Sequence, residues 1–227
     1  MIIARDVCKS YKTAVLSSAS SEFPAGQVTF LMGANGAGKT TFFKCLLDLE
    51  KCRGTFDFDG LTFAQVRNQV FAVFDDAPLY PRLNGYANVE MLLNSRISKN
   101  DLNDAWKLGT KRSSVDLLKK PVRTYSSGQR KRLQLAAAIL CRPRYLILDE
   151  VASGLDLETM DAAIRMIRSL KSESVIIASG HQFDFYARVV DRVVLLRNGH
   201  MEDIEGDGDR NASQLERIYR AHAAQVD

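Results

Sequence analysis

The chain has 227 residues and a formal net charge of +4, with 46% hydrophobic and 26% charged residues. Its length is enough for one sizeable core with room for an inserted subdomain, and its composition is ordinary for a soluble globular protein. The weak positive charge is spread along the chain, so charge alone indicates neither a nucleic-acid-binding nor a membrane-surface protein.

The hydropathy pattern argues against a membrane-spanning protein. No stretch approaches the ~20 apolar residues that a spanning helix needs, and the N-terminus lacks the long apolar core of a signal peptide. If the protein works at a membrane, we expect another chain to span it. Four cysteines match no C-x-x-C spacing, which favours reduced cysteines over a metal or redox site.

Three strands are predicted before residue 33. Residues 2–6 form a short strand, a polar turn follows, and residues 14–23 form a second strand rich in small side chains. After a Pro-Ala-Gly turn, the apolar run 28–32 forms the third strand. Because the chain begins with strands that precede its first strand-loop-helix unit, we predict a small antiparallel sheet packed against an α/β core.

The segment that follows, GANGAGKT at 33–40, fits the pattern G-x-x-x-x-G-K-[ST]. It lies between the 28–32 strand and a helix predicted at 41–49, which is the context that this phosphate loop requires and which disfavours a chance Gly-rich turn. The glycines let consecutive N–H groups point at phosphate oxygens, and the helix N-terminus adds partial positive charge. We expect Lys39 to reach the β- and γ-phosphates and Thr40 to ligate Mg²⁺. The predicted nucleotide-binding residues of this loop are Gly33, Ala34, Asn35, Gly36, Ala37, Gly38, Lys39, Thr40 and Thr41.

A change of character near residue 80 predicts a helical insertion. Before this point, a half-exposed strand is predicted at residues 54–60. A second strand, buried on both faces, is predicted at residues 70–74 and is followed by two aspartates. Short helices are then predicted at 86–95, 102–108 and 114–118, and a strong amphipathic helix at 127–140.

Beyond residue 141 the pattern returns to buried strands and surface helices. Strands are predicted at 145–148, 175–178 and 193–196, the last followed by an Asn-Gly hairpin turn, and helices at 157–170 and 214–224. We therefore predict one α/β domain over 1–227. It has a phosphate-loop NTPase (RecA-like) core with its β subdomain at about 1–79 and 142–210, a helical subdomain at about 80–141, and a C-terminal helix at 211–227.

Polar side chains follow several of the buried strands, where ligands bind in open α/β sheets. Asp149 is placed to hold Mg²⁺ through water, and Glu150 to polarise an attacking water, although two acids can also be a solvated strand end. His181 is placed to contact a γ-phosphate, although a lone histidine is more often structural. Ser126 to Gly128 opens the long helix and offers a hydroxyl and free N–H groups to an anion, or is simply a helix cap.

Taken together, these motifs resemble the nucleotide-binding subunits of ATP-binding-cassette (ABC) transporters over nearly the whole chain. The signature motif corresponds to residues 125–129, the Mg²⁺ aspartate and catalytic glutamate to Asp149 and Glu150, and the dimer-crossing loop to residues 153–156. His181 corresponds to the switch histidine, and Tyr11 lies where the family stacks an aromatic ring on adenine.

The resemblance implies a mechanism and a set of partners. Two cassettes, identical or different, pair head-to-tail, and each Mg²⁺-bound ATP is held between the phosphate loop of one and the signature of the other. Glu150, His181 and Lys39 are then catalytic, and Thr40, Asp75 and Asp149 surround the metal. The residues that contact the partner's nucleotide are Ser126, Ser127, Gly128, Gln129 and Asp156. A separate transmembrane permease is implied, with this chain on the cytoplasmic face of the membrane.

Two positions depart from the family pattern. The family usually has Gln after the 70–74 strand, where this chain has Asp75 or Asp76, and we align Asp75; its carboxylate is shorter and charged but can reach Mg²⁺ through water. Ser127 replaces the first signature glycine and narrows the approach to the γ-phosphate. Because the phosphate loop, the two acids and the histidine are all present, we expect hydrolysis to survive.

The stretch Leu79 to Val89 is similar to that of exporter subunits, so we expect a compact exporter-type subunit. Two alternatives stay open. One is a soluble cassette ATPase that acts on protein or nucleic acid, suggested by a basic cluster of Lys119, Lys120, Arg123, Arg130, Lys131 and Arg132. Because this cluster lacks interleaved aromatics apart from Tyr125, we expect no nucleic-acid partner. The other is a weakly hydrolysing ATP-sensing regulator, suggested by Asp75 and Ser127.

Overall fold

A six-stranded sheet forms the centre of the chain in the computed structural model, which describes residues 1–75, 79–107, 115–204 and 211–223. Its strand order is β5-β6-β7-β3-β8-β9, and only β9, paired with β8, runs antiparallel to its neighbour. The carboxyl ends of the five parallel strands therefore meet at one edge. The strands are β3 (Val28–Met32), β5 (Val70–Val73), β6 (Tyr145–Asp149), β7 (Val175–Ser179), β8 (Arg192–Arg197) and β9 (His200–Ile204).

A second, antiparallel sheet has the order β2-β1-β4 and consists of β1 (Ile2–Ser10), β2 (Ala14–Phe23) and β4 (Arg53–Phe58). The hairpin between β8 and β9 joins it to the central sheet, because the Ser17 amide donates to the Gly199 carbonyl at 2.8 Å. A side chain at Gly199 would place its Cβ 2.6 Å from that amide nitrogen, so the approach requires glycine.

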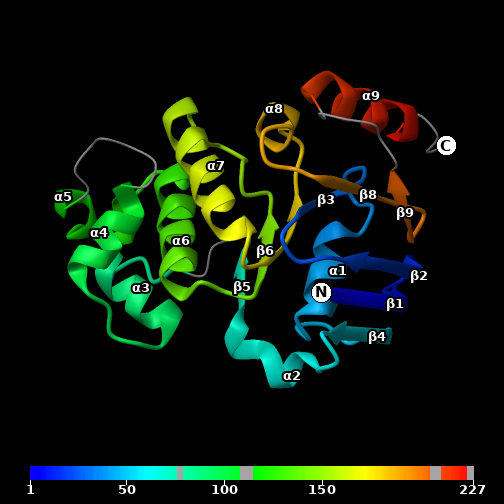
Figure 1. The fold of residues 1–227 in the computed structure, drawn as a ribbon, viewed down its shortest axis with the longest axis horizontal. Coiled ribbons are helices and arrows are strands. Elements are labelled where there is room, and N and C mark those ends of the chain that lie inside the picture. The colour runs from blue at the N-terminus through cyan, green and yellow to red at the C-terminus, as the bar shows by residue number, and fades with distance from the viewer. Residues whose placement is uncertain (76–78, 108–114, 205–210, 224–227) are drawn as a thin grey trace.

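The helices lie around the central sheet, and α3 to α6 gather at the end of the molecule opposite β1, β2 and β4 (Figure 1). Two 3₁₀ turns, Arg67–Gln69 and Val122–Thr124, complete the described structure. None of the described helices is long and apolar enough to cross a membrane. The helices are α1 (Lys39–Leu46), α2 (Phe63–Val66), α3 (Gly85–Leu93), α4 (Lys99–Lys107), α5 (Val115–Leu118), α6 (Ser127–Cys141), α7 (Leu157–Lys171), α8 (Phe183–Tyr186) and α9 (Ala212–Ala223).

Both faces of the central sheet are buried, which explains why its strands are continuous apolar runs. In β3, Phe30 packs in the cluster shared with α6 and α7, whereas the next residue, Leu31, packs on the opposite face against Phe42 and Phe43 of α1. All four side chains are fully buried. Burial of each such side chain contributes about 1.5–3 kcal/mol, so the two cores hold the edge of the sheet in place from both sides.

The predicted fold class and the predicted order of strands and helices are confirmed. The sequence pattern missed α2, α8 and β9. It also ended the first strand too early, because Asp6 has φ of +51° and shifts the register of β1, which breaks the alternation on which the prediction depended. The first helix ends at Leu46 rather than 49, since Asp48 has left-handed backbone angles. Asp76 and Ser114 lie outside the described residues, and the subdomain boundaries stay predictions.

Asp59 joins the N-terminus of the chain to the start of β6 and generates a stability prediction. Its carboxylate accepts hydrogen bonds from the Met1 amine, from Arg144 at 2.8 Å and from the Tyr145 hydroxyl at 2.7 Å. Burial alone would raise the pKa of Asp59, but these bonds outweigh it and lower the pKa to about 2.

Because the folded-state pKa lies below the ordinary 3.8, this stabilisation is fully present above pH ~4 and is lost as the pH falls towards 2. Asp59→Asn should therefore lower the thermal midpoint at pH 7, and the difference from the parent chain should shrink as the pH approaches 2. Differential scanning fluorimetry across this range measures it, with Asp57→Asn as the control. A difference that stays constant with pH would contradict the assignment.

Candidate functional site

The phosphate loop connects β3 to α1 at the carboxyl edge of the central sheet. Gly36 and Gly38 have φ of +78° and +104°, in the left-handed region that favours glycine. A Cβ on Gly38 would lie 2.8 Å from Cγ1 of Val15, and one on Gly33 would lie 2.6 Å from the Leu196 carbonyl oxygen. The loop is therefore packed closely between β2 and β8. Glycine is required in the motif both because a side chain would clash and because the backbone is left-handed.

Lys39, the first residue of α1, bends back across the loop. Its ammonium donates to the carbonyl oxygens of Gly33 at 2.8 Å and Ala34 at 3.0 Å, and the residue is only 7% exposed. Burial lowers the pKa of Lys39, although the nearby Glu150 and Asp149 carboxylates oppose this shift. The loop thus holds a desolvated cation at its centre, where an anionic ligand is attracted most strongly.

Thr40 and Asp149 present two adjacent oxygen atoms beside that cation. The Thr40 hydroxyl donates to Oδ2 of Asp149 at 2.7 Å, and the Ser179 hydroxyl donates to Oδ1 at 2.5 Å. Magnesium prefers such hard oxygen donors and commonly takes one or two protein ligands together with water and phosphate. The pair therefore fits a Mg²⁺ ion, although no cluster of three or more acidic, His or Cys side chains occurs among the described residues.

Glu150 follows Asp149 in a left-handed conformation, with φ of +53°, and its amide donates to the Ser179 carbonyl at 3.0 Å. Burial raises the pKa of its carboxyl group, with Lys39 opposing and Asp149 adding to the increase. Oε1 lies 3.5 Å from Nε2 of His181, whose pKa is lowered by burial and then by Lys39. His181 is therefore neutral at pH 7, and the structure brings Lys39, Thr40, Asp149, Glu150 and His181 together.

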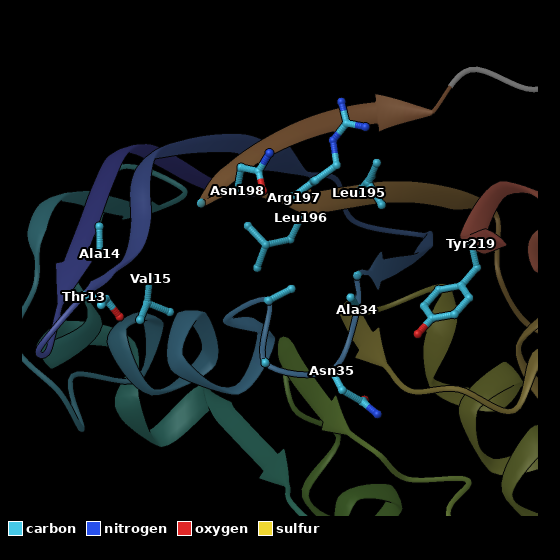
Figure 2. A pocket seen from close by; sticks show the side chains of 14 residues that line it. Thr13, Ala14, Val15, Ala34, Asn35, Leu195, Leu196, Arg197, Asn198 and Tyr219 are labelled. Carbon is cyan, nitrogen blue, oxygen red and sulfur yellow. The ribbon is translucent and has the colours of Figure 1, made fainter. Parts of the chain in front are cut away.

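Tyr219 of α9 is a site residue that the sequence analysis missed. Its ring meets the His181 ring edge-on, with centroids 5.7 Å apart at 79°, and lies 5.4 Å from the Phe183 ring. Tyr219 also borders a cavity of about 290 Å³ between the phosphate loop and the β8–β9 hairpin (Figure 2). The sequence pattern predicted an amphipathic terminal helix but not this contact, because Tyr219 and His181 are far apart in the sequence. The cavity is lined by Thr13, Ala14, Val15, Gly33, Ala34, Asn35, Gly36, Ala37, Leu195, Leu196, Arg197, Asn198, Gly199 and Tyr219.

Tyr11, predicted to stack on adenine, does not line this cavity. Its ring is 55% exposed near Thr41, its hydroxyl donates to Glu50, and the Lys9 ammonium lies 4.8 Å from the ring centroid. One aromatic face is thus occupied by a cation, and stacking on adenine stays a prediction.

Asp75, predicted near the metal, makes its close contact elsewhere. Its Oδ1 lies 2.7 Å from the Lys131 ammonium of α6, and its side chain is 60% exposed. The structure therefore brings Asp75 to the signature helix rather than into hydrogen bonding with Thr40 or Asp149. Asp75 still contributes a negative charge that raises the pKa of Glu150, so it belongs to the same electrostatic site.

The signature residues form the start of α6. Ser126 caps the helix by accepting from the Gln129 amide at 3.1 Å, and the Gln129 side chain accepts from the Ser126 amide at 3.0 Å. A Cβ on Gly154 would lie 3.1 Å from the Ser127 hydroxyl, so this turn packs against the loop before α7. Asp156 caps α7 through the Thr159 amide at 2.8 Å. Within one chain, the start of α6 therefore packs against the loop before α7.

This fold and this loop define a phosphate-loop nucleotide hydrolase. A family model described as ABC transporter matches residues 16–153, more than half of the chain. The chain belongs to this family, and it is an ATP-binding, ATP-hydrolysing transporter domain that uses Mg²⁺.

Relatives and solved structures agree with this assignment. The chain is 29% identical over 230 residues to the lantibiotic transport ATP-binding protein SrtF of Streptococcus pyogenes, covering 95% of both. It is 28% identical over 211 residues to the tungstate uptake system ATP-binding protein TupC of Peptoclostridium acidaminophilum, covering 90% of this chain and 98% of TupC. The post-hydrolysis dimer of the ATP-binding cassette MJ0796 with ADP and phosphate has a TM-score of 0.79 at 20% identity, covering 91% of this chain and 100% of that one, which shows the fold.

The contact between Tyr219 and His181 generates a prediction about the imidazole. Tyr219→Ala should expose the ring and raise the pKa of His181 towards its ordinary 6.5, because burial is the main cause that lowers it. NMR titration of the histidine Cε1 protons measures this shift directly, since the chain has only three histidines. Tyr219→Phe keeps the aromatic contact and should leave the pKa unchanged. An unchanged pKa in Tyr219→Ala would show that the ring does not bury His181.

Proposed function

We propose that this chain pairs head-to-tail with a second cassette on the cytoplasmic face of a membrane and drives a separate permease, in the direction of export. The observation that supports the ATP-driven part of this proposal is the hydrogen bond between Thr40 and Asp149 beside the buried Lys39 ammonium. These groups come from separate segments and place oxygen donors and a cation where a Mg²⁺-bound triphosphate needs them.

The residues around this bond have distinct roles in the proposal. The amides of the loop from Gly33 to Thr40 and the Lys39 ammonium bind the phosphates, while Thr40 and Asp149 hold Mg²⁺. ATP supplies the γ-phosphoryl group whose transfer to water releases free energy. Glu150 orients that water and accepts its proton, since the burial that raises its carboxyl pKa makes it a better base. Neutral His181 donates one hydrogen bond towards the γ-phosphate position.

The second cassette completes the site in this proposal. Ser126 and Gln129 hydrogen-bond to each other, and Ser127 packs against Gly154; in the proposal, a partner chain therefore brings a signature to each nucleotide. Asp156 lies on the same surface, and the next residue, Leu157, is 81% exposed. Leu157 directly follows the predicted dimer-crossing loop at the start of α7, and the head-to-tail arrangement would cover it.

A groove on the helical end is the proposed contact with the permease. Tyr80, Leu83 and Met91 are 50%, 37% and 53% exposed and lie in the segment that resembles exporter subunits. A hollow of about 370 Å³ separates α3 from the segment that follows it, and its lining mixes apolar side chains with charges of both signs. The lining residues are Leu83, Ala87, Glu90, Met91, Asn94, Ser95 and Arg96.

The relatives do not decide the direction of transport, since one is named for lantibiotic transport and another for tungstate uptake. The proposed direction of export therefore rests on the resemblance of Leu79 to Val89 to exporter subunits. The alternative of a nucleic-acid-directed ATPase is weakened by burial of part of the basic cluster. Lys131 is bonded inside the protein, and Arg132 donates to the Trp106 carbonyl at 2.6 Å and stacks over the Trp106 ring at 4.6 Å. The ATP-sensing alternative is separated from a transport ATPase by the rate of hydrolysis.

Glu150→Gln should reduce ATP hydrolysis at least about 100-fold, because a general base contributes factors of this size. ATP binding should persist, since Glu150 does not hold the phosphates, and the variant should accumulate as an ATP-dependent dimer in light-scattering chromatography. Glu173→Gln, an exposed acid paired with Arg142, is the control. Parent-like hydrolysis in Glu150→Gln would contradict the proposed base, and very slow hydrolysis in the parent would favour the weakly hydrolysing ATP-sensing regulator.

The permease contact is tested by affinity capture from detergent-solubilised membranes, using Glu150→Gln with ATP. An integral membrane protein should copurify with this chain, and adding Met91→Asp should abolish the capture, because a charge would be buried in the groove. Leu61→Asp, at another exposed apolar position, should not. Recovery of only soluble proteins or nucleic acid would contradict the proposal.

A further inference from the structure

Lys131 is a buried lysine beside Glu150. Lys131 lies on α6, two residues after the last signature residue Gln129, and its side chain is only 4% exposed. Its ammonium has three N–H donors, and three acceptors surround it: Asp75 Oδ1 at 2.7 Å, the Glu150 carbonyl at 2.8 Å and the Ser153 carbonyl at 2.6 Å. All three donors are thus used, which a buried ammonium requires.

These contacts fix the backbone of Glu150 at both ends. Its amide donates to the Ser179 carbonyl, and its carbonyl accepts from Lys131. Between the two bonds the residue has a φ of +53°, a conformation that non-glycine residues rarely adopt without support from their surroundings. The direction of the Glu150 side chain depends on this backbone, so the Lys131 bond bears on where the carboxylate points.

We propose that Lys131 is a positioning residue for Glu150, with Asp75 as the counter-ion that allows a charged side chain to be buried there. This inference rests on the proposed catalytic role of Glu150. It accounts for Asp75, the position where the family usually has Gln, because a neutral amide would leave the buried ammonium without a countercharge. It also gives α6 two functions: its first turn carries the signature, and its second turn holds the catalytic loop of the same chain.

Both the charge of Asp75 and the hydrogen bonds of the 150–153 turn contribute to this arrangement. Asp75 is 60% exposed, whereas Lys131 is nearly inaccessible, so water cannot replace Asp75 fully at the ammonium. The Ser153 amide also donates to the Glu150 carbonyl, at 3.1 Å, and closes a tight turn over residues 150–153. Lys131 therefore holds the turn from its carbonyl side, and any displacement of α6 would move the catalytic carboxylate.

The test uses the 227-residue chain and four variants. Lys131→Met removes the donors, Asp75→Gln removes the countercharge, and the double variant Asp75→Gln with Lys131→Gln replaces the ion pair by two amides that can bond to each other and to the carbonyls. Lys171→Gln, which breaks the Lys171–Asp191 pair on the far end of α7, is the control.

Lys131→Met should reduce kcat at least about tenfold with little change in KM, because a misdirected catalytic group costs rate rather than substrate binding. Asp75→Gln should also reduce kcat, and the double variant should recover to within about threefold of the parent, since neither the buried charge nor the missing donor remains. A parent-like kcat in Lys131→Met, or a double variant no better than the two single ones, would overturn the proposal.

A second readout does not depend on turnover and separates failure of this inference from failure of the proposed function. Hydrogen–deuterium exchange in the nucleotide-free chain should become faster at the amides of 150–155 in Lys131→Met and stay unchanged there in Lys171→Gln. Faster exchange in Lys131→Met, combined with parent-like hydrolysis in Glu150→Gln, would leave the structural role of Lys131 intact and contradict only the catalytic role of Glu150. Unchanged exchange would show that Lys131 does not hold the turn.

Discussion

The site depends on one buried carboxylate. Asp149 is 4% exposed at the end of β6, where it accepts hydrogen bonds from Thr40 and Ser179. A buried carboxylate is costly unless it is hydrogen-bonded or paired, so these two hydroxyls are structural requirements as well as parts of a metal site. They come from the start of α1 and the end of β7, which means that the charge holds three segments of the sheet edge together.

Glu150 and His181 take their places from the same edge. The amide of Glu150 donates to the carbonyl of Ser179, whose hydroxyl binds Asp149, and His181 follows Ser179 by two residues. The parallel order β6-β7-β3 puts the ends of these strands beside the phosphate loop. The relative position of Glu150 and His181 is therefore a consequence of strand order, and the local sequence only supplies the side chains.

This division explains how far the sequence could be interpreted. The phosphate loop, the Asp-Glu pair and His181 follow predicted strands, and the rule that ligands bind at the carboxyl ends of parallel strands was enough to bring them together. The contacts of Tyr219 with His181 and of Lys131 with Glu150 could not be predicted. Each joins segments that are brought together only by tertiary packing, which no motif in the sequence encodes. The sequence alone also could not separate the members of the basic cluster, since it does not reveal that Lys131 and Arg132 are buried while Lys119 and Lys120 are exposed.

The two departures from the family pattern are consequently unequal. If Lys131 neutralises Asp75, the loss of the usual Gln is compensated within the chain, and Asp75 is no reason to expect a weak site. Ser127 has a different position: it lies in the first turn of α6, where its hydroxyl packs against Gly154. As part of the signature, it would meet the partner's nucleotide in the proposed head-to-tail pair. Whatever asymmetry a heterodimer containing this chain has should therefore originate at Ser127, and it would reduce turnover at the nucleotide held by the partner's phosphate loop rather than at this chain's own.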